Sequence, residues 1–518
     1  MKTDCEISVE VPECPDASGE IETQIRQTVD ACISFVNEDC DALKLYEFEQ
    51  LLCLRIATIF RLCVALFLAV RRQRLDVSEY TGDGWRVKKR FAQRTIKTTY
   101  GPVRYGRAYL TRRNGGGWFP LDAVLGVTQD GFSLRVVDIV TRLATRLSYS
   151  ATRGAAKAIL GWAPSTEAIE LLVIGVGQRA PAFIATQGVF EDDGEVLVIE
   201  VDGKAVPMAT EAELEARRQK RKHASNCSCG CQRHRGRKRR KGKKKKRKKR
   251  GHNSKNGRSA TLVAMYTLRR GEDGKLHGPI NKKIWGQFGK RQQAMQWARA
   301  QATRRGFGPG TNKVIQIVLD GERCLRKELQ KLFPNATLTL DLRHAQEYLW
   351  KAGRLFHEEG SAELAAWVQP LHDLLLAGKV VQLLARLRKI QASVSRRGPN
   401  TKKKREGLQK VIEYYEPRQE IMRYDEYHRD DLVLATGVIE GACRYVIGER
   451  LDCSGMRWAL AGAEPLLQLR CIELNGDWSH FLTWISEQTT AELQHGELVA
   501  LRSPKPKLKS ETTKKLAA

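Results

Sequence analysis

The chain has 518 residues, a formal net charge of +30 at pH 7 and a sequence pI near 9.7. Hydrophobic residues make up 42% of it, which excludes a disordered or fibrous protein and predicts about two to four globular domains. The positive excess is larger than solubility requires and predicts a polyanionic partner, with nucleic acid as the first candidate.

The sequence gives no sign of secretion or of membrane insertion. Its N-terminal residues are too acidic and too weakly apolar for a signal peptide. The most apolar window, residues 51–70, is interrupted by Arg55 and Arg61, which favours a buried or partner-facing helix over a membrane span. The 13 cysteines include no CxxC pair and indicate reduced thiols rather than a standard zinc ribbon. We therefore expect a soluble cytoplasmic protein with no membrane partner.

The first part of the chain is predicted to be helical over residues 1–80, followed by a small β-rich basic module over residues 81–130. Residues 95–112 alternate apolar and basic side chains across a Gly-Pro turn, which is typical of a β-hairpin. One face of the hairpin is expected to offer phosphate contacts to DNA from Arg104, Arg107 and Arg112. A basic face without a ligand is equally consistent with this pattern.

A helix-turn-helix-like DNA-binding region is predicted over residues 131–190. Residues 149–160 can form one helix, a Gly-Trp-Ala-Pro segment ends it, and Ser165 with Thr166 offers an N-cap for a second. Many helical hairpins share this arrangement, so the signal is weak alone. Its position beside the basic hairpin favours DNA contacts from Ser165 and Thr166.

The first part of an α/β core is predicted over residues 191–345. Residues 195–201 (EVLVIEV) form a dense apolar strand that ends at Asp202, Gly203 and Lys204, and residues 260–268 form a second strand. Residues 216–258 between them are predicted to be a basic, disordered arm. Its 20 Lys or Arg residues between positions 217 and 250, with no acid among them, include Lys243, Lys244 and Lys245. The Cys227, Cys229 and Cys231 cluster in this arm is spaced more tightly than usual zinc ligands, so chance placement is favoured.

A strand over residues 313–319, a helix over 322–333 and a strand over 337–340 predict a parallel βαβ unit. Asp320 and Asp341 then follow the two strands, where open α/β sheets place their sites. Residues 346–432 are predicted to be a helical insertion, and residues 433–480 to return to the core. Residues 481–518 are predicted to be a solvated tail.

Residues 438–447 place six apolar side chains on one arc of a helix, with Glu440 at its edge. Glu440 is either an ordinary boundary glutamate or a carboxylate that points into a cleft. Together with Asp202 and Asp320 it forms a set of acids of the kind that two-metal phosphodiester chemistry needs. Converging carboxylates repel one another unless a metal, or simple distance, resolves the conflict.

This order of elements resembles an RNase H-like DDE transposase. The segments VDGKAVPM, LDLRHAQEYLWKAG and VIEGACRYVIGERLD, continued by SGMRWALAGAEPLLQLR, are similar to ISKra-type insertion-sequence transposases, and the likeness covers roughly residues 90 to 480. The resemblance implies an RNase H-like mixed sheet flanked by helices, with an all-α insertion. It further implies cleavage of double-stranded DNA at transposon terminal repeats and strand transfer into target DNA with two Mg²⁺ (or Mn²⁺) ions, by a homodimer or higher homo-oligomer.

By this resemblance Asp202 and Asp320 match the catalytic aspartates and Glu440 the catalytic glutamate, all three as metal ligands. Asp341 is the alternative second aspartate, and His344 would orient DNA or a metal ligand. Further DNA contacts are expected from Lys204, Arg343, Arg444, Arg457 and Trp458, although core packing is the favoured alternative for Trp458. Two other functions stay open: an RNase H-like nuclease or resolvase that cuts without joining, and a domesticated DNA-binding protein with a silent centre.

Overall fold

The computed structural model describes residues 8–38, 40–113, 115–187, 190, 192–210, 213–215, 257–308, 310–453, 456–494 and 499–504. The chain divides into two units, one of Met1–Ile184 with Ala461–Ala518 and the other of Ala185–Leu460. The expected grouping of residues 461–480 with the α/β core is wrong, because these residues pack within the first unit.

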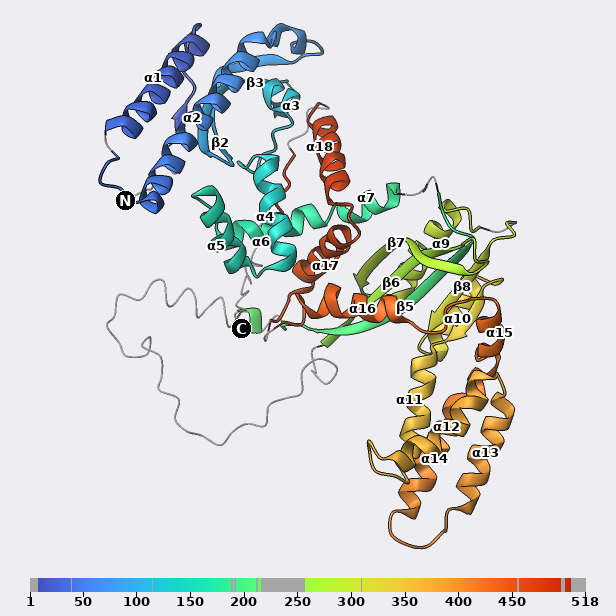
Figure 1. The fold of residues 1–518 in the computed structure, drawn as a ribbon. Helices are drawn as coiled ribbons and strands as arrows, with labels where there is room; N and C mark the ends of the chain where they lie inside the picture. Colours follow the sequence, from blue (N-terminus) through green and yellow to red (C-terminus); the bar gives the residue numbers. More distant parts are fainter. Residues whose placement is uncertain are drawn as a thin grey trace, which may run out of the picture. The chain divides into compact units, whose positions relative to one another are not determined.

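The first unit begins with a helical hairpin on a small sheet (Figure 1). The hairpin consists of α1 (Ala17–Glu38) and α2 (Leu45–Arg74). The sheet has the order β1-β3-β2, with β4 beside β3, and consists of β1 (Val9–Glu10), β2 (Arg86–Thr98), β3 (Gly101–Thr111) and β4 (Gly117–Trp118). β2 and β3 are antiparallel and connected at Thr98 and Gly101, which confirms the predicted β-hairpin.

Helices make up the rest of the described part of this unit: η2 (Val77–Tyr80), α3 (Pro120–Val124), α4 (Leu134–Arg146), α5 (Tyr149–Leu160), α6 (Thr166–Gly177), α7 (Ala180–Thr186), α17 (Leu460–Leu474) and α18 (Trp478–Gln494). Gly161 ends α5 in the left-handed region at φ 73°, and the Ser165 hydroxyl accepts the Ala168 amide at the start of α6. The predicted pair of helices is therefore confirmed, with its cap. The predicted tail is wrong over α18, because Phe481, Ile485 and Leu493 are buried there.

Two segments, Leu45–Arg74 and Thr166–Thr186, are long and apolar enough by composition to cross a membrane. This is weak evidence, because core helices of soluble proteins pass the same test. In the second segment 56% of the apolar window is buried inside the protein.

The second unit is a mixed sheet of five strands in the order β7-β6-β5-β8-β9. The strands are β5 (Val196–Pro207), β6 (Gly257–Arg270), β7 (Leu276–Phe288), β8 (Val314–Leu319) and β9 (Thr337–Leu340). β5, β6 and β7 are antiparallel neighbours, whereas β8 runs parallel to β5 and to β9. The mixed α/β architecture and the parallel βαβ unit agree with the prediction.

Alternation along the strands gives the sheet two different faces. Leu197, Ile199 and Ile317 point into a core closed by three helices, α9 (Arg291–Arg304), α10 (Arg323–Leu332) and α11 (Leu342–Gly353). Val198 and Val318 lie on the opposite face, against Val433 and Val438. That second face is the one on which the polar residues of the sheet gather.

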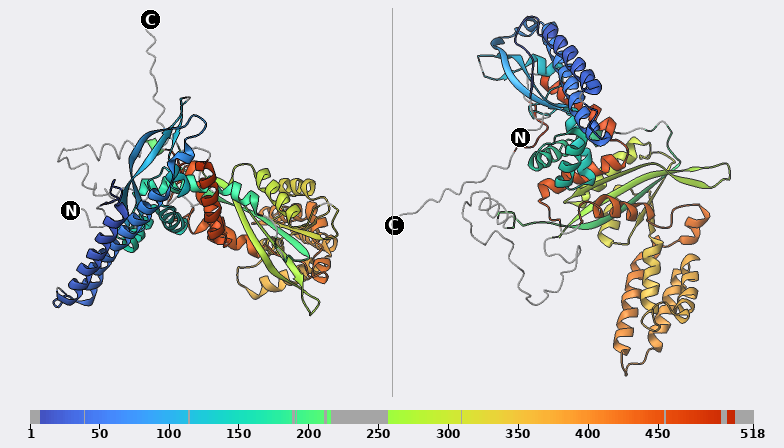
Figure 2. Two further views of the ribbon diagram at one scale, coloured as in Figure 1. Left: turned by 90° about the horizontal axis from the view of Figure 1, so that it is seen from above. Right: turned by 60° about the vertical axis from the view of Figure 1, so that its left-hand side comes forward.

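The predicted helical insertion is confirmed as α12 (Ala362–Leu376), α13 (Val380–Ser393), α14 (Thr401–Tyr415), η3 (Glu416–Ile421) and α15 (Tyr424–Arg429). In the right-hand view of Figure 2, α12, α13 and α14 extend away from the sheet. Tyr424 and Tyr427 of α15 instead donate hydrogen bonds to the carbonyls of Leu340 and Leu338 in β9. The chain then returns to the sheet as α16 (Gly437–Ala442), which continues directly into the π-helix η4 (Cys443–Gly448).

Candidate active site

Three aspartates occupy one row across three neighbouring strands. The parallel register pairs Glu200 with Val318 and Val318 with Thr339. Two residues further along each strand this register aligns Asp202, Asp320 and Asp341. Because residues two apart on a strand share a face, all three lie on the face that α16 covers. Asp202 lies inside β5 rather than at its end, but it does lie where the pairing of β5 with β8 stops.

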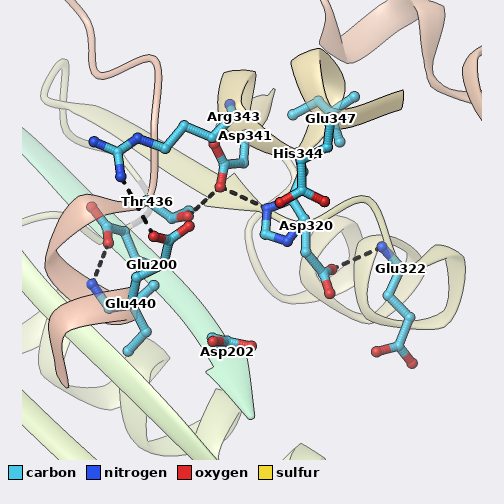
Figure 3. A network of polar contacts seen from close by, with 12 residues as sticks. Glu200, Asp202, Asp320, Glu322, Asp341, Arg343, His344, Glu347, Thr436 and Glu440 are labelled. Atoms are coloured by element: carbon cyan, nitrogen blue, oxygen red, sulfur yellow. Dashed lines mark hydrogen bonds and ion pairs between the residues drawn. The ribbon is translucent and has the colours of Figure 1, made fainter. Parts of the chain in front are cut away.

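Asp341, His344 and Glu440 come closest to one another. One ligand atom from each lies within 4.8 Å of the others, and among the described residues no other group of three acids, histidines or cysteines is this compact. Figure 3 shows the Glu440 carboxylate approaching Asp341 from α16. The edge position predicted for Glu440 is therefore confirmed: its side chain is 38% exposed.

Asp341 is fully buried, and both oxygens of its carboxylate accept hydrogen bonds from protein groups. Oδ1 accepts the Arg343 amide at 2.8 Å, and Oδ2 accepts Nδ1 of His344 at 2.8 Å as well as the hydroxyl of Thr436. Burial alone would raise the pKa of Asp341, but the bonds from His344 and Thr436 outweigh it and lower that pKa below its usual value. Asp341 therefore orients the imidazole and caps α11.

Asp320 lies beside His344 and is half-buried. Its Oδ1 accepts the Glu322 amide at 3.0 Å, and within the described part of the chain no hydrogen bond is formed to its Oδ2. The hydrogen bond to Asp341, together with the negative charges of Asp341 and Asp320, raises the pKa of His344 despite its partial burial. Both aspartates therefore favour the protonated form of the imidazole.

Asp202, on β5, lies apart from the group of Asp341, His344 and Glu440, below it in the view of Figure 3. It accepts its neighbouring amide, from Gly203, at 2.6 Å. Burial raises the pKa of the Cys443 thiol, and the charge and hydrogen bonding of Asp202 raise it further. Asp202 therefore faces the start of η4, one turn beyond Glu440.

Glu200 is a buried carboxylate that the sequence analysis did not single out. Its Oε2 accepts the backbone amide of Ile439 at 2.8 Å, and its Oε1 accepts the hydroxyl of Tyr266 at 2.6 Å. Burial raises the pKa of Glu200 to about 6, even though these two bonds act in the opposite direction. Glu200 ties α16 to the centre of the sheet; the one signal for it was a lone acid inside the apolar run EVLVIEV.

The hairpin residues expected to contact DNA divide between the two faces. Arg107 is 5% exposed and donates to Asp122 at 2.7 Å, so it belongs to the interior of the module. The prediction that it shares a face with Arg104 and Arg112 is wrong, because an odd and an even residue of one strand point in opposite directions. Arg104 is exposed beside Glu10, at 3.2 Å, and Arg112 is exposed with its guanidinium over the Trp85 ring.

Of the predicted DNA contacts near Glu440, Trp458 is buried and donates its indole N–H to the Leu451 carbonyl at 2.9 Å. The stacking role predicted for it is therefore wrong, and the core alternative holds. Arg457 forms an ion pair with Glu213, and Lys204 lies 3.7 Å from Asp452. Arg444 and Arg343 are exposed, and the Arg343 guanidinium lies 3.7 Å from the Glu440 carboxylate.

Ser165 and Thr166 are exposed at the start of α6, next to exposed Glu167 and Glu170. Ser165 has a local role as the helix cap, and DNA contact by either residue stays a prediction. Lys243, Lys244 and Lys245, as well as the Cys227, Cys229 and Cys231 cluster, lie outside the described residues.

The donor set suits a hard divalent cation. The group that the structure brings together is Asp341, His344 and Glu440, two carboxylates and an imidazole. Asp202 and Asp320 add carboxylate oxygens in the same row of the sheet, which are ligands that Mg²⁺ and Mn²⁺ prefer, and Oδ2 of Asp320 accepts no hydrogen bond from the described residues. Asp341 is the least suited of the four acids, because both of its oxygens already accept hydrogen bonds.

Comparison with models of known protein families gave no match, and no curated protein matches the sequence.

Proposed function

We propose that this protein is a metal-dependent DNA transposase with an RNase H-like core, which cuts DNA at the ends of a mobile element and joins them to target DNA. The observation that carries the proposal is the row of Asp202, Asp320 and Asp341 on one face of the sheet, with Glu440 delivered to that face by α16. A sheet of three antiparallel strands extended by two parallel ones supports the RNase H-like assignment.

The proposed metal ligands are Asp202, Asp320 and Glu440. Bound Mg²⁺ or Mn²⁺ ions would activate the attacking oxygen and stabilise the leaving one. Asp341 is proposed to act as a positioning residue that holds His344 in place, because its carboxylate has no free oxygen. This preference for Asp320 over Asp341 rests on hydrogen bonding rather than on position along the chain.

The cations at the rim of the site are proposed to hold the DNA backbone. Arg343 is 66% exposed and Lys204 is 37% exposed, and among the described residues each forms one ion pair, at 3.7 Å. Such loosely paired cations can exchange their partners for phosphates at low free-energy cost. Double-stranded DNA, as terminal repeats and as target, is the proposed substrate.

The deciding experiment follows cleavage and joining of candidate end sequences with Mg²⁺ or Mn²⁺. Three substitutions each remove a proposed metal ligand: Asp202→Asn, Asp320→Asn and Glu440→Gln. Each should leave DNA binding intact and lower the rate of cleavage about a thousandfold. Asp341→Asn should lower it less, and Glu347→Gln, an exposed acid on the same helix α11 as His344, should not change it. Calorimetric titration with Mn²⁺ gives a second readout, in which only the three ligand variants lose affinity.

Other outcomes would replace the proposal. Near wild-type cleavage by Asp202→Asn would remove the acid row from the mechanism. Cleavage without joined products would indicate a nuclease or resolvase, and sequence-specific binding without cleavage would indicate a silent DNA-binding protein.

A further inference from the structure

The outward face of α2 carries a regular, mostly apolar row that ends at Arg74. Residues at intervals of seven, namely Tyr46, Cys53, Phe60, Phe67 and Arg74, are all exposed. Phe60 is 44% exposed and Phe67 54%, which is unusual for phenylalanines at the middle of a 30-residue helix. A second row, Glu49, Ile56, Cys63 and Val70, lies three residues further on and is exposed or half-buried.

Two rows with these offsets form the a and d positions of a heptad repeat, which is the pattern of a helix that packs against a parallel or antiparallel partner helix. We call these two rows the α2 seam. α1 does not occupy it, because α1 packs through Phe35 against Phe48, with ring centroids 5.9 Å apart, and under the Arg55 guanidinium. Phe48 and Arg55 lie two residues past Tyr46 and Cys53, so they point about 160° away from the seam.

The inner side of α2 is packed firmly against its own unit. Leu62, Ala65 and Leu68 are buried in the core between α2 and the small sheet. The seam is therefore presented by a helix that is held firmly on its other side.

We propose that the α2 seam binds the α2 seam of a second copy of this chain, with the two helices antiparallel. The charge distribution selects this occupant and this direction. The start of the seam is acidic at Glu49, and its end is basic at Arg74 and at Arg71, an exposed residue beside the seam. A twofold axis at Phe60 places Glu49 opposite Arg71, Tyr46 opposite Arg74 and Cys53 opposite Phe67.

Parallel pairing of the same helices would place Glu49 against Glu49 and Arg74 against Arg74, which is unfavourable. The antiparallel arrangement is self-complementary, as a twofold interface has to be. Tyr100, from the β2–β3 turn, packs on Phe60 with ring centroids 4.8 Å apart and is itself 40% exposed, so it adds aromatic surface at the axis.

A lipid bilayer is the other apolar environment that this helix could enter, but the observations favour a protein partner. Insertion of α2 into a bilayer would remove Leu62 and Leu68 from the core that they form with the small sheet. It would also place Arg61, which donates to Thr58 at 2.8 Å, in the middle of the membrane. This inference is independent of the proposed function.

The test measures the mass of the full chain, freed of nucleic acid, by sedimentation at micromolar concentration. The wild type is expected at twice 58.5 kDa. A Phe60→Glu, Phe67→Glu variant should raise the dimer dissociation constant by on the order of a hundredfold, because charges would be buried unpaired at the centre of the interface. Val381→Glu, which changes an apolar residue on α13 that is 72% exposed, should leave the dimer intact.

Two further variants keep the test decisive if the double variant fails to fold. Glu49→Arg and Arg71→Glu should each weaken the dimer, and their combination should restore it. Phe60→Cys, in a Cys53→Ser, Cys63→Ser background, should form a disulfide-linked dimer under mild oxidation, since only the residue on the axis meets its own copy.

A monomeric wild type, or a Cys53–Cys53 crosslink in the unaltered chain, would overturn the proposal, the latter by showing a parallel pair. So would flotation of the wild-type chain with vesicles of phosphatidylcholine and phosphatidylglycerol, which would assign the seam to a membrane.

Discussion

Glu200 shows how much one buried side chain does for this site. It is fully buried, yet both of its oxygens accept hydrogen bonds, one of them from the backbone of the helix that carries Glu440. A carboxylate in this position holds α16 at a fixed height above the row of aspartates. The residue touches neither the proposed metal ligands nor solvent, so its role is positional.

Substitutions of Glu200 should separate its geometry from its charge. Glu200→Gln can still accept a hydrogen bond from the Ile439 amide and can donate one to Tyr266. The rate of cleavage should therefore fall by no more than about tenfold. Glu200→Ala leaves that amide unpaired in the interior, which costs about 1–3 kcal/mol, and should abolish cleavage while lowering the melting temperature. Equal effects of both variants would show that the charge, rather than the hydrogen bond, matters.

The same residue predicts a pH dependence of stability. Its pKa is about 6 in the folded protein and near 4.5 when unfolded, so the folded state holds the proton more tightly. The stability that Glu200 gains from its bound proton is fully present below pH 4.5 and is lost as pH rises through 6. The free energy of unfolding should fall by about 2 kcal/mol across this range. In melting curves without divalent metal, the wild type should therefore lose stability relative to Glu200→Gln across this range. A constant difference between the two would contradict the assignment.

At the scale of elements, the hairpin β2–β3 carries cations of two kinds. Arg94 and Arg107 both donate to Asp122 at 2.7 Å, and Tyr105 donates to the same carboxylate at 2.8 Å, all in the interior of the module. Arg104 on the other face is half-exposed. One strand therefore supplies both an internal ion cluster and a basic surface.

Arg107→Ala should destabilise the first unit by about 1–3 kcal/mol, because buried Asp122 loses one of its two cationic partners while Arg94 and Tyr105 still donate to it. Arg104→Ala should change stability by less than about 0.5 kcal/mol and weaken DNA binding instead. Chemical denaturation together with DNA titration of the full chain distinguishes the two. Loss of DNA affinity in a fully stable Arg107→Ala protein would contradict the internal role.

The sequence was sufficient for some elements and not for others, for identifiable reasons. Strands followed directly by an acid, such as those before Asp320 and Asp341, are evident because apolar runs and Asp-containing turns are both local signals. β7 was missed because Leu276–Phe288 includes Gly278, Pro279 and two lysines and shows no regular alternation of apolar residues. Two features of the site could not be read from the sequence, because they depend on contacts between residues far apart in the chain: the hydrogen bond from Thr436 to Asp341 and the one from the Ile439 amide to Glu200.

At the scale of the whole molecule, charge is distributed very unevenly. The run from residue 217 to 250 carries 20 of the 89 Lys and Arg residues and no acid. Bound phosphates release counterions, so each one neutralised contributes about −0.9 to the slope of log K against log salt. The run is therefore expected to dominate the salt dependence of DNA binding.

Deleting residues 217–250 should flatten that slope by several units while leaving cleavage of short ends detectable at low salt. Fluorescence titration of end DNA across a salt series measures the slope. A neutral variant with Gln at the same 20 positions is the matched control for length. An unchanged slope in both would show that the run does not contact DNA.

The π-helix η4 limits which changes of sequence length the chain can tolerate near Glu440. Cys443–Gly448 contains one residue more per turn than an α-helix would, directly after Glu440. Loss of a single residue here would restore regular winding and rotate Glu440 by about 100° relative to the buried Val446 and Ile447. Substitutions in this segment are thus tolerable where they keep its length, whereas a one-residue deletion turns the glutamate away from the aspartates.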